Sequence, residues 1–362
     1  MIIKNQAKKI SSLFFFAVIL SCSIFNLTAN AQDVTEASSY YLPKTAIDFT
    51  ILIEKTTCEP GDLNMYAERF LKKNDVATKP STSYRILNIK MINKGIPDTT
   101  KLFTPAIDTK HSITSLKVDE QGIIMAVNAE TPPPTERKAF APAPKPEPLN
   151  SREYLTQDIL SAGSKAKMAE LTAQEIYDIR DSKSQLNKGQ ADFMPKDGEQ
   201  LRIMLNNLNT QEAALLQLFE GITEKDTIES VITFVPEKDT DKSILFRFSQ
   251  KFGLTDTDDL SGIPYYIKVD DLHKMVSNTA TVEGMKKSKD DANIYANLPG
   301  KIKLTLFKEE QELGSQEFYA AQFGKTLPLD NELFGKKLLT SLVYNPTTGN
   351  IDTIKTEMLK KQ

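Results

Sequence analysis

The spacing of apolar residues predicts β-strands in the first third of the chain. Ile47, Phe49, Ile51 and Ile53 recur at every second position, which is the period of one buried face of a sheet. Pro60-Gly61 ends this strand, and the apolar spacing over 62–73 is helical. Residues 32–130 are therefore predicted to form a β-rich region with one helix. Its further strands are expected at 83–92, 102–103, 112–118 and 123–127, with a hairpin turn at 119–122.

The middle of the chain, over 150–225, has the spacing of two amphipathic helices. Thr172-Ala173-Gln174-Glu175 matches a capping box, although the first helix can begin earlier, near Ser164, and Gly189 ends it. A second helix is expected over 197–221, with a kink or break at 206–210. The two helices most simply form an antiparallel pair. We expect their apolar stripes to be buried in a core rather than to form a groove for a partner.

A proline-rich segment over 131–149 precedes the helices and differs from both of its flanks. Seven prolines fall within it, among them the run Pro132-Pro133-Pro134. Proline fixes φ and lacks the backbone N–H, so this segment is not expected inside a sheet or a helix. We interpret it as an extended linker of up to about 50 Å, at about 3 Å per residue. A ligand for a proline-binding domain is the alternative.

Apolar residues again recur at every second position beyond residue 226. The predicted strands are 228–236, 243–249, 265–269, 302–307 and 316–320, followed by a closing pair at 341–344 and 351–354. Regular short strands separated by turn residues favour a sandwich or a part-open barrel. The predicted fold class is therefore α+β: two β-rich, sandwich-like regions, over 32–130 and 226–362, with the amphipathic helical pair between them.

The first 31 residues have the features of a bacterial-type signal peptide, in the usual order. Three lysines precede an apolar run over 13–20, which is too short to span a bilayer as a helix. Ala29-Asn30-Ala31 then provides the small-x-small pattern for cleavage before Gln32. We therefore expect an exported protein, in the periplasm or associated with the outer membrane of a Gram-negative cell.

A second processing site competes with this cleavage. Ile19-Leu20-Ser21-Cys22 resembles a lipobox, which would make Cys22 a lipidated N-terminus. The residues after Cys22 are largely apolar rather than a solvated tether, and the downstream site at Ala29, Ala31 and Gln32 is complete. These two observations favour a product without a lipid, and lipidation at Cys22 stays the alternative.

Charge and cysteine content exclude several classes of protein. Removing the three lysines of the signal peptide lowers the net charge from −3 to −6, so the chain lacks the basic excess on which nucleic-acid binding depends. No second long apolar run follows, so no transmembrane segment is expected in the mature chain. Only Cys58 remains after cleavage, which leaves no intramolecular disulfide, and a structural thiol is favoured over a nucleophile. The oligomeric state stays open.

Motifs for catalysis and for cofactors are incomplete. His111 and His273 are the only histidines, and neither zinc-type spacing nor a Gly-x-Ser-x-Gly elbow is present. Gly324-Lys325-Thr326 resembles the end of a phosphate-binding loop, but Tyr319 stands where that loop requires glycine. We therefore assign no cofactor and no catalytic residue.

Asp256, Asp258 and Asp259 form an acidic cluster and are weak candidates for calcium ligands. Leu260 and Ser261 follow them, where an EF-type loop would need an oxygen ligand and a glycine. A solvated turn is the favoured interpretation of this cluster, and calcium binding is the alternative.

Short stretches spread over nearly the whole mature chain resemble one family. They are Tyr41-Leu42-Pro43-Lys44-Thr45, Glu54-Lys55-Thr56-Thr57, Tyr66-Ala67-Glu68, Lys167-Met168-Ala169-Glu170, Ile176-Tyr177-Asp178-Ile179-Arg180, Met194-Pro195-Lys196-Asp197-Gly198, Ala321-Gln322-Phe323-Gly324 and Tyr344-Asn345-Pro346-Thr347-Thr348-Gly349. The chain resembles an uncharacterised family of exported Bacteroidota proteins that carries a domain-of-unknown-function label. The resemblance implies export in a Gram-negative envelope, and implies no catalytic or binding residue.

The expected function follows mainly by exclusion. A non-catalytic protein of the cell envelope that binds or helps to assemble another envelope protein is the leading hypothesis. One alternative is a carboxylate-based hydrolase of envelope or dietary polymers, because paired acids cannot be recognised from sequence distance. The other is a binder of a small ligand or a glycan, although the absence of tryptophan weakens sugar stacking.

Overall fold

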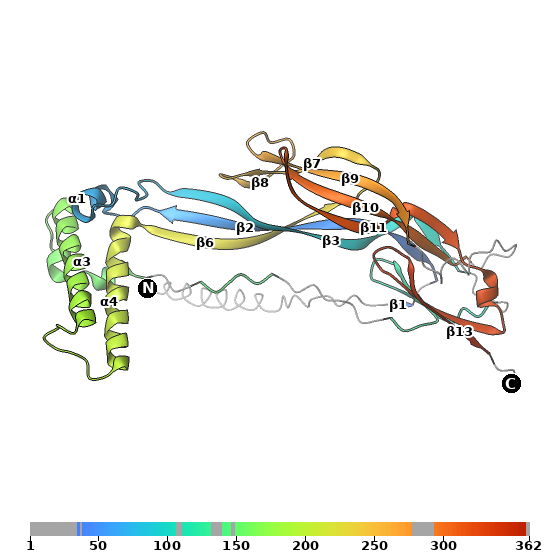
Figure 1. Ribbon diagram of the computed structural model, residues 1–362, viewed down its shortest axis with the longest axis horizontal. Coiled ribbons are helices and arrows are strands. Elements are labelled where there is room, and N and C mark those ends of the chain that lie inside the picture. The colour runs from blue at the N-terminus through green and yellow to red at the C-terminus, as the bar shows by residue number, and fades with distance from the viewer. Residues whose placement is uncertain are drawn as a thin grey trace, which may run out of the picture.

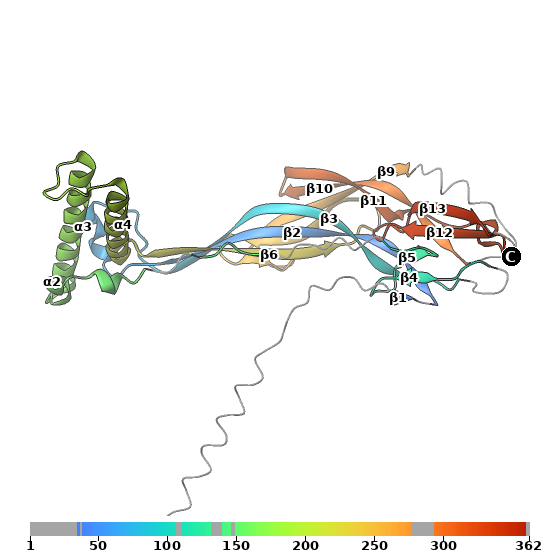
Figure 2. The same ribbon diagram turned by 90° about the horizontal axis from the view of Figure 1, so that it is seen from below.

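The computed structural model describes residues 35–36, 38–105, 111–131, 140–145, 149–276 and 293–359. The predicted signal peptide, with Cys22, Ala29, Ala31 and Gln32, lies outside the described residues. The described residues are 23% helical and 48% strand and form three antiparallel sheets and four α-helices, which confirms the α+β class. The molecule is elongated: the helices form a head at one end, and the sheets extend from it to the other end (Figures 1 and 2).

A central three-stranded sheet runs along the long axis. Its order is β3 (Ser81–Phe103), β2 (Tyr40–Glu59) and β6 (Ile222–Phe234). The predicted alternation in β2 is confirmed, because its four apolar residues from Ile47 to Ile53 are all buried in one core. The strands expected at 83–92 and 102–103 are joined as the single strand β3.

A five-stranded sheet packs on this central sheet to form a sandwich. Phe246, Ile267 and Leu304 face the β2 side chains in the shared core. The five strands are, in order, β11 (Gln311–Pro328), β10 (Tyr295–Lys308), β9 (Ile263–Met275), β7 (Thr240–Ser249) and β8 (Gly253–Thr255).

The third sheet lies at the end opposite the head. It consists of β1 (Thr35–Glu36), β4 (Leu116–Val118), β5 (Ile124–Val127), β12 (Leu338–Tyr344) and β13 (Ile351–Met358). The predicted turn between β4 and β5 is confirmed: the Gly122 N–H donates to the Asp119 carbonyl at 3.0 Å, and Gly122 has a φ of +80°. The sheet packs over Tyr40, Leu42 and the 3₁₀ turn η3 (Asn331–Phe334).

The two predicted β-rich regions contribute strands to the same sheets. β2, from the N-terminal region, pairs with β6, and Ile51 lies opposite Ser230. β5 pairs in turn with β12, where Leu342 lies opposite Val127. Position along the chain therefore does not separate the two regions in space.

The head consists of four helices and two 3₁₀ turns with a core of their own. Its elements are η1 (Asn64–Tyr66), α1 (Ala67–Leu71), η2 (Ser151–Tyr154), α2 (Gln157–Leu160), α3 (Lys165–Lys188) and α4 (Gly198–Glu220). Ala169 and Ala173 near the start of α3 pack with Leu215 and Phe219 near the end of α4. α3 and α4 are therefore antiparallel, as predicted. The helix expected over 62–73 is short, because Lys72 adopts a left-handed φ of 57° that ends it.

Side-chain caps fix the bounds of the long helices. The Ser164 hydroxyl accepts a hydrogen bond from the Lys167 N–H, so α3 begins there and not at the capping box near Thr172. Gly189 ends α3 with a φ of +69°. Asp197 caps α4, which continues without interruption through 206–210, so the expected kink or break is absent.

The central sheet continues beyond the sandwich as a neck, which we define as residues 55–59, 81–83 and 222–226. None of these neck residues is buried. The predicted linker connects the same two ends of the molecule, because the chain leaves β5 at Val127 and enters the head at η2. In its described part, Lys145 forms an ion pair with Asp226 of β6 at 2.5 Å.

A buried polar network joins the three sheets, which we call the junction. The Asn297 amide is fully buried and donates to the carbonyls of Pro43 and Thr348, at 3.0 Å each. It also accepts a hydrogen bond from the Thr326 hydroxyl at 2.7 Å. The loop over 345–350 approaches β3 so closely that a Cβ on Gly95 would lie 2.0 Å from the Pro346 carbonyl oxygen.

Candidate functional site

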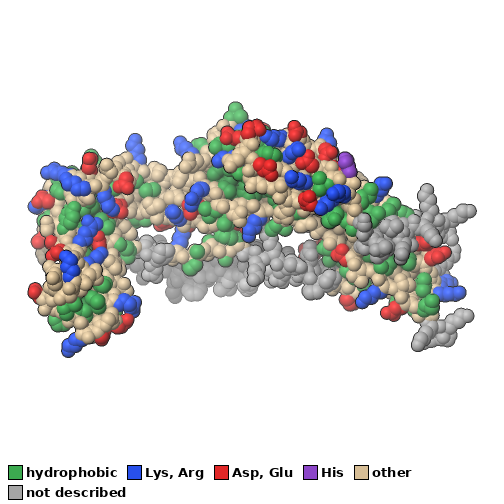
Figure 3. Space-filling model, in the orientation of Figure 1, with side chains coloured by type: hydrophobic (Ala, Val, Ile, Leu, Met, Phe, Trp, Pro, Cys, Tyr) green, Lys and Arg blue, Asp and Glu red, His purple; other side chains and the backbone are tan. Residues whose placement is uncertain are grey.

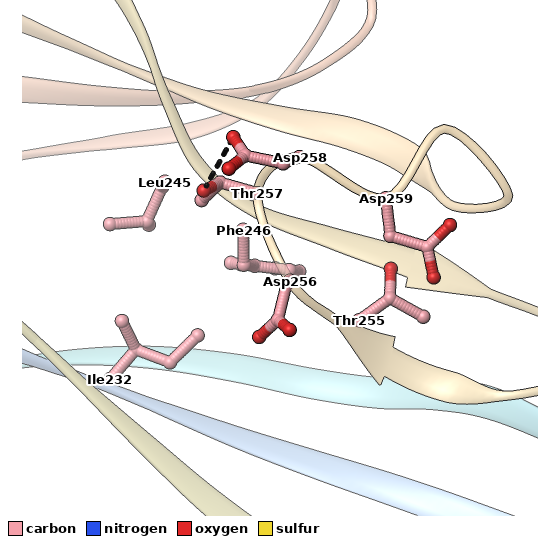
Figure 4. A pocket seen from close by; sticks show the side chains of 8 residues that line it. All are labelled: Ile232, Leu245, Phe246, Thr255, Asp256, Thr257, Asp258 and Asp259. Carbon is pink, nitrogen blue, oxygen red and sulfur yellow. Dashed lines mark hydrogen bonds between the residues drawn. The ribbon is translucent and has the colours of Figure 1, made fainter.

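An open cavity lies at one edge of the sandwich, next to the acidic cluster (Figure 4). Ile232 of β6 and Leu245 and Phe246 of β7 supply its apolar side. Thr255 of β8 and the acidic residues over 256–259 supply its polar side. The cavity therefore combines an apolar surface with carboxylates, and its chemistry depends on whether those carboxylates converge.

The three candidate calcium ligands do not converge. Figure 4 shows the carboxylates of Asp256, Asp258 and Asp259 pointing in different directions. Asp259 accepts a hydrogen bond from the Ser261 N–H at 2.9 Å, and this bond lowers the pKa of Asp259. Within the described part of the chain, no group of three His, Cys, Asp or Glu side chains is placed to hold a metal ion. We therefore build no metal site on this loop.

Among the described residues, two carboxyl groups have a raised pKa, which is one mark of a general acid. Burial raises the pKa of Asp119, whose carboxylate accepts hydrogen bonds from the Gln121 and Ile123 N–H groups and so closes the β4–β5 turn. Burial also raises the pKa of Asp352, which accepts from the Asn345 amide at the end of the β12–β13 hairpin. Both groups hold turns of the third sheet and neither lines the cavity, so local structure accounts for them.

The one thiol among the described residues and the two imidazoles lie in separate parts of the molecule. Cys58 is in the neck, where its sulfur accepts a hydrogen bond from the Thr223 hydroxyl at 3.5 Å. His111 forms an isolated bridge with Gly335 beside the third sheet. His273 is 81% exposed at the end of β9, with Nδ1 3.1 Å from Asp271. These positions do not bring Cys58 and an imidazole together.

The stretch that resembles a phosphate-binding loop lies inside a strand. Gly324-Lys325-Thr326 belongs to β11, and Lys325 lies opposite Leu298 of β10. A Cβ on Gly324 would lie 1.7 Å from the Leu298 carbonyl oxygen, so a close approach of two strands explains this glycine. A phosphate-binding loop would instead lead into a helix.

Large apolar side chains are exposed at the free end of the α3–α4 pair, which we call the tip. Phe193 and Met194 lie in the connection between the helices and are 72% and 38% exposed, and Ile203 of α4 is 48% exposed. Figure 3 shows hydrophobic side chains gathered at this end of the head. The fully buried core of the head lies at the other end of the pair, next to the neck. The tip is therefore an apolar surface held away from all three sheets.

Ion pairs between the two helices hold the hairpin that carries the tip. Glu212 of α4 accepts a hydrogen bond from Arg180 Nε at 2.6 Å and another from Lys183, both on α3. Burial acts to raise the pKa of Glu212, but the hydrogen bonds from Lys183 and Arg180 outweigh it and hold that pKa below the ordinary value. Glu212 is only 13% exposed, whereas Arg180 and Lys183 are 38% and 23% exposed, so solvent screens these pairs in part.

We expect these ion pairs to make the stability of the head depend on pH. Because the folded pKa of Glu212 is lowered, its contribution is present above the ordinary glutamate pKa, about 4.3, and is lost as the pH falls through the folded value. Glu212→Gln should lower the free energy of unfolding by about 1–2 kcal/mol at pH 7. Urea unfolding at pH 7 and at pH 3 measures this, and the difference between variant and parent should shrink at pH 3. An unchanged difference would contradict this role.

The sequence predicted the two helices that carry the tip, but it did not predict that the tip is exposed. The apolar spacing of α4 predicted a buried stripe, and Leu201, Met204, Leu205 and Leu208 are in fact only partly buried. The sequence feature that could have indicated the exposed tip is Phe193-Met194, two large apolar residues in the connection between two capped helices. Nothing in the spacing of the helices indicates which end of the pair carries the core.

The fold and the candidate surface define an elongated α+β protein: a double-layer sheet body, a neck and a helical head with an apolar tip. No described helix is long and apolar enough to cross a membrane. The chain belongs to the family described as domain of unknown function DUF4831, whose profile matches residues 36–352 and so includes the head, the central and five-stranded sheets and the third sheet up to the start of β13. This match confirms the expected domain-of-unknown-function family. No curated protein and no solved structure matches the chain.

Proposed function

We propose that this is an exported, non-catalytic protein of the cell envelope that binds another envelope protein through the tip of its head. The N-terminal features over 1–31 support export to the periplasm or to the outer membrane. The observation that carries the binding role is the exposure of Phe193, Met194 and Ile203 at the end of a head that the neck holds away from the sheets.

Exposed aromatic and methionine side chains are typical anchors of protein interfaces. Phe and Met supply a large apolar area, and both are enriched in the buried centres of such interfaces. At the tip, charged residues such as Lys196 and Arg202 are also exposed and would form a polar rim around the anchors. The matching partner is a folded protein with an apolar pocket, because a few anchors in such pockets carry most of the binding energy.

The test is capture of the partner from the native cell. The full chain, with an affinity tag at the C-terminus, is cross-linked in living cells, purified, and its bound proteins are identified by mass spectrometry. Truncating a central anchor commonly costs about 2 kcal/mol or more. Phe193→Ser combined with Met194→Ser is therefore expected to reduce recovery of a defined partner at least tenfold.

The matched control is Leu260→Ser, which changes a side chain that is 84% exposed in the loop between β8 and β9. This variant removes a comparable exposed apolar group on the body and should capture the partner normally. Equal recovery with the tip variant and with the parent would reject the tip as the binding surface. Recovery without any defined envelope protein would reject the binding role.

A further inference from the structure

The outer edge of the third sheet is open at β13. β13 is the last strand in the order of this sheet and, among the described residues, it pairs with β12 alone. The Leu359 N–H donates to the Lys337 carbonyl at 2.9 Å, on the β12 side. Backbone groups alternate in direction along an antiparallel strand, so Thr353, Lys355 and Glu357 also face β12. The N–H and C=O groups of residues 354, 356 and 358 therefore point outward.

The side chains of β13 leave the approach to this edge clear. Thr353, Lys355, Thr356 and Glu357 are exposed, and Met358 is 85% exposed. Proteins commonly protect a free edge with proline, with a bulge or with charged side chains, lysine above all. From residue 353 to residue 358, β13 has no proline, and its pairing with β12 shows no register shift. Its one lysine is a charge that the right partner could neutralise.

We propose that the protein forms a homodimer through its β13 strands, which pair antiparallel across a two-fold axis at Thr356. In this register Thr356 lies opposite the same residue of the second copy, Ile354 lies opposite Met358, and Lys355 lies opposite Glu357. Each unlike pair occurs twice, because a two-fold interface presents the same patch from both subunits. The two third sheets thereby become one continuous sheet. This inference does not depend on the tip or on the proposed envelope partner.

The charged residues of β13 favour this register over registers in which the two-fold axis lies at another residue of the strand. An axis at Lys355 places lysine opposite lysine, and an axis at Glu357 places glutamate opposite glutamate, both of which are destabilising. An axis at Ile354 leaves Lys355 opposite a threonine. With the axis at Thr356, both charged pairs are attractive, and the outward backbone groups of residues 354, 356 and 358 meet as hydrogen-bonded pairs.

Apolar contacts also favour the register with the two-fold axis at Thr356. Ile354 is half-buried against the core of the third sheet, and Met358 lies on the same face four residues further along. Pairing Ile354 with Met358 of the second copy covers the exposed methionine and extends this core across the axis. The result is a self-complementary edge that combines an apolar pair, an ion pair and backbone hydrogen bonds.

The test measures self-association of the purified, processed protein by sedimentation from about 1 to 100 µM, a range that covers micromolar dissociation constants. Lys355→Glu places glutamate against glutamate and is expected to weaken the dimer at least tenfold. Lys355→Glu combined with Glu357→Lys exchanges the two charges and should restore the parent's dissociation constant. Loss followed by rescue cannot arise from a general loss of stability.

A second variant tests the backbone pairing. Thr356→Pro removes an N–H that faces outward, a position where an edge strand tolerates proline, so the monomer should stay folded by circular dichroism while the dimer is lost. Lys90→Glu, an exposed charge reversal on β3, is the control and should dimerise normally. A parent that stays monomeric throughout, or a dimer that is unaffected by both Lys355→Glu and Thr356→Pro, would overturn the proposal.

Discussion

Replacing Phe219 with alanine is expected to unfold the head before the sheets. Phe219 is fully buried near the end of α4, in a core to which only residues of the head contribute. Removing a buried phenylalanine side chain typically costs about 3–5 kcal/mol, because apolar contacts are lost and a cavity is left. The cores of the sandwich and of the third sheet share no residue with the head, so their stability should be unchanged.

Thermal unfolding followed by two spectroscopic signals compares the unfolding temperature of the head with that of the sheets. Circular dichroism at 222 nm reports mainly the helices. Near-ultraviolet dichroism reports mainly the buried tyrosines Tyr40, Tyr265 and Tyr344 of the sheets, because Tyr66 and Tyr154 of the head are only partly buried. In the variant the first signal should change at a clearly lower temperature than the second. Phe193→Ala, at the exposed tip, is the control and should leave both unchanged. Coincident transitions in the Phe219 variant would show that the head and the sheets unfold as one unit.

Replacing Asn297 with alanine is expected to destabilise the sheet body by about 3 kcal/mol. The substitution leaves the carbonyls of Pro43 and Thr348 and the hydroxyl of Thr326 without their partner inside the junction. Each buried polar group that loses its hydrogen bond costs about 1–3 kcal/mol, and solvent reaches this site poorly because Asn297 is fully buried. The loss should affect all three sheets, because the junction joins β2, β10 and the β12–β13 loop.

Urea unfolding followed by near-ultraviolet dichroism gives this free energy. Asn88→Ala provides a matched control, because Asn88 is exposed on β3, and its loss should cost less than about 0.5 kcal/mol. A cost below about 1 kcal/mol for Asn297→Ala would mean that water or a neighbouring side chain replaces the amide. The junction would then not hold the sheets together.

Local features of the chain were predictable because each depends on few neighbours. Alternating apolar residues in β2, the glycine at the β4–β5 turn and the caps of α4 all act within a few residues, and the structure forms each of them. The start of α3 was predicted twice, at Ser164 and at Thr172. Only a helix that begins after Ser164 includes the buried residue Ala169, which packs against α4.

Pairings between distant strands were not predictable from one sequence. The partner of Ile51 in β6 lies about 180 residues further along, and no local pattern identifies it. The full length of β3 and β6 was missed for another reason. In the neck both faces of the sheet are solvated, so a stretch such as Ser81-Thr82-Ser83 shows no apolar alternation.

The candidate surfaces depend on the same long-range information. Phe193 and Met194 are recognisable as apolar residues in a connection, but their exposure follows from the position of the head core at the other end of the helices. Likewise, Lys355 and Glu357 become a complementary pair only because β13 is the last strand of its sheet.

The neck determines how the molecule responds to mechanical force. β2 alone is 20 residues long, about 65 Å at the usual rise per residue, and three strands enter the head, at Glu59, Ser81 and Ile222. Tension applied between the head and the far end of the body therefore acts along the strands. β2, β3 and β6 all continue from the head into the body, so this load is shared by three backbones that are already extended, while the hydrogen bonds between the strands lie across its direction. The neck therefore resists lengthening along its axis, because a strand has little further extension to give.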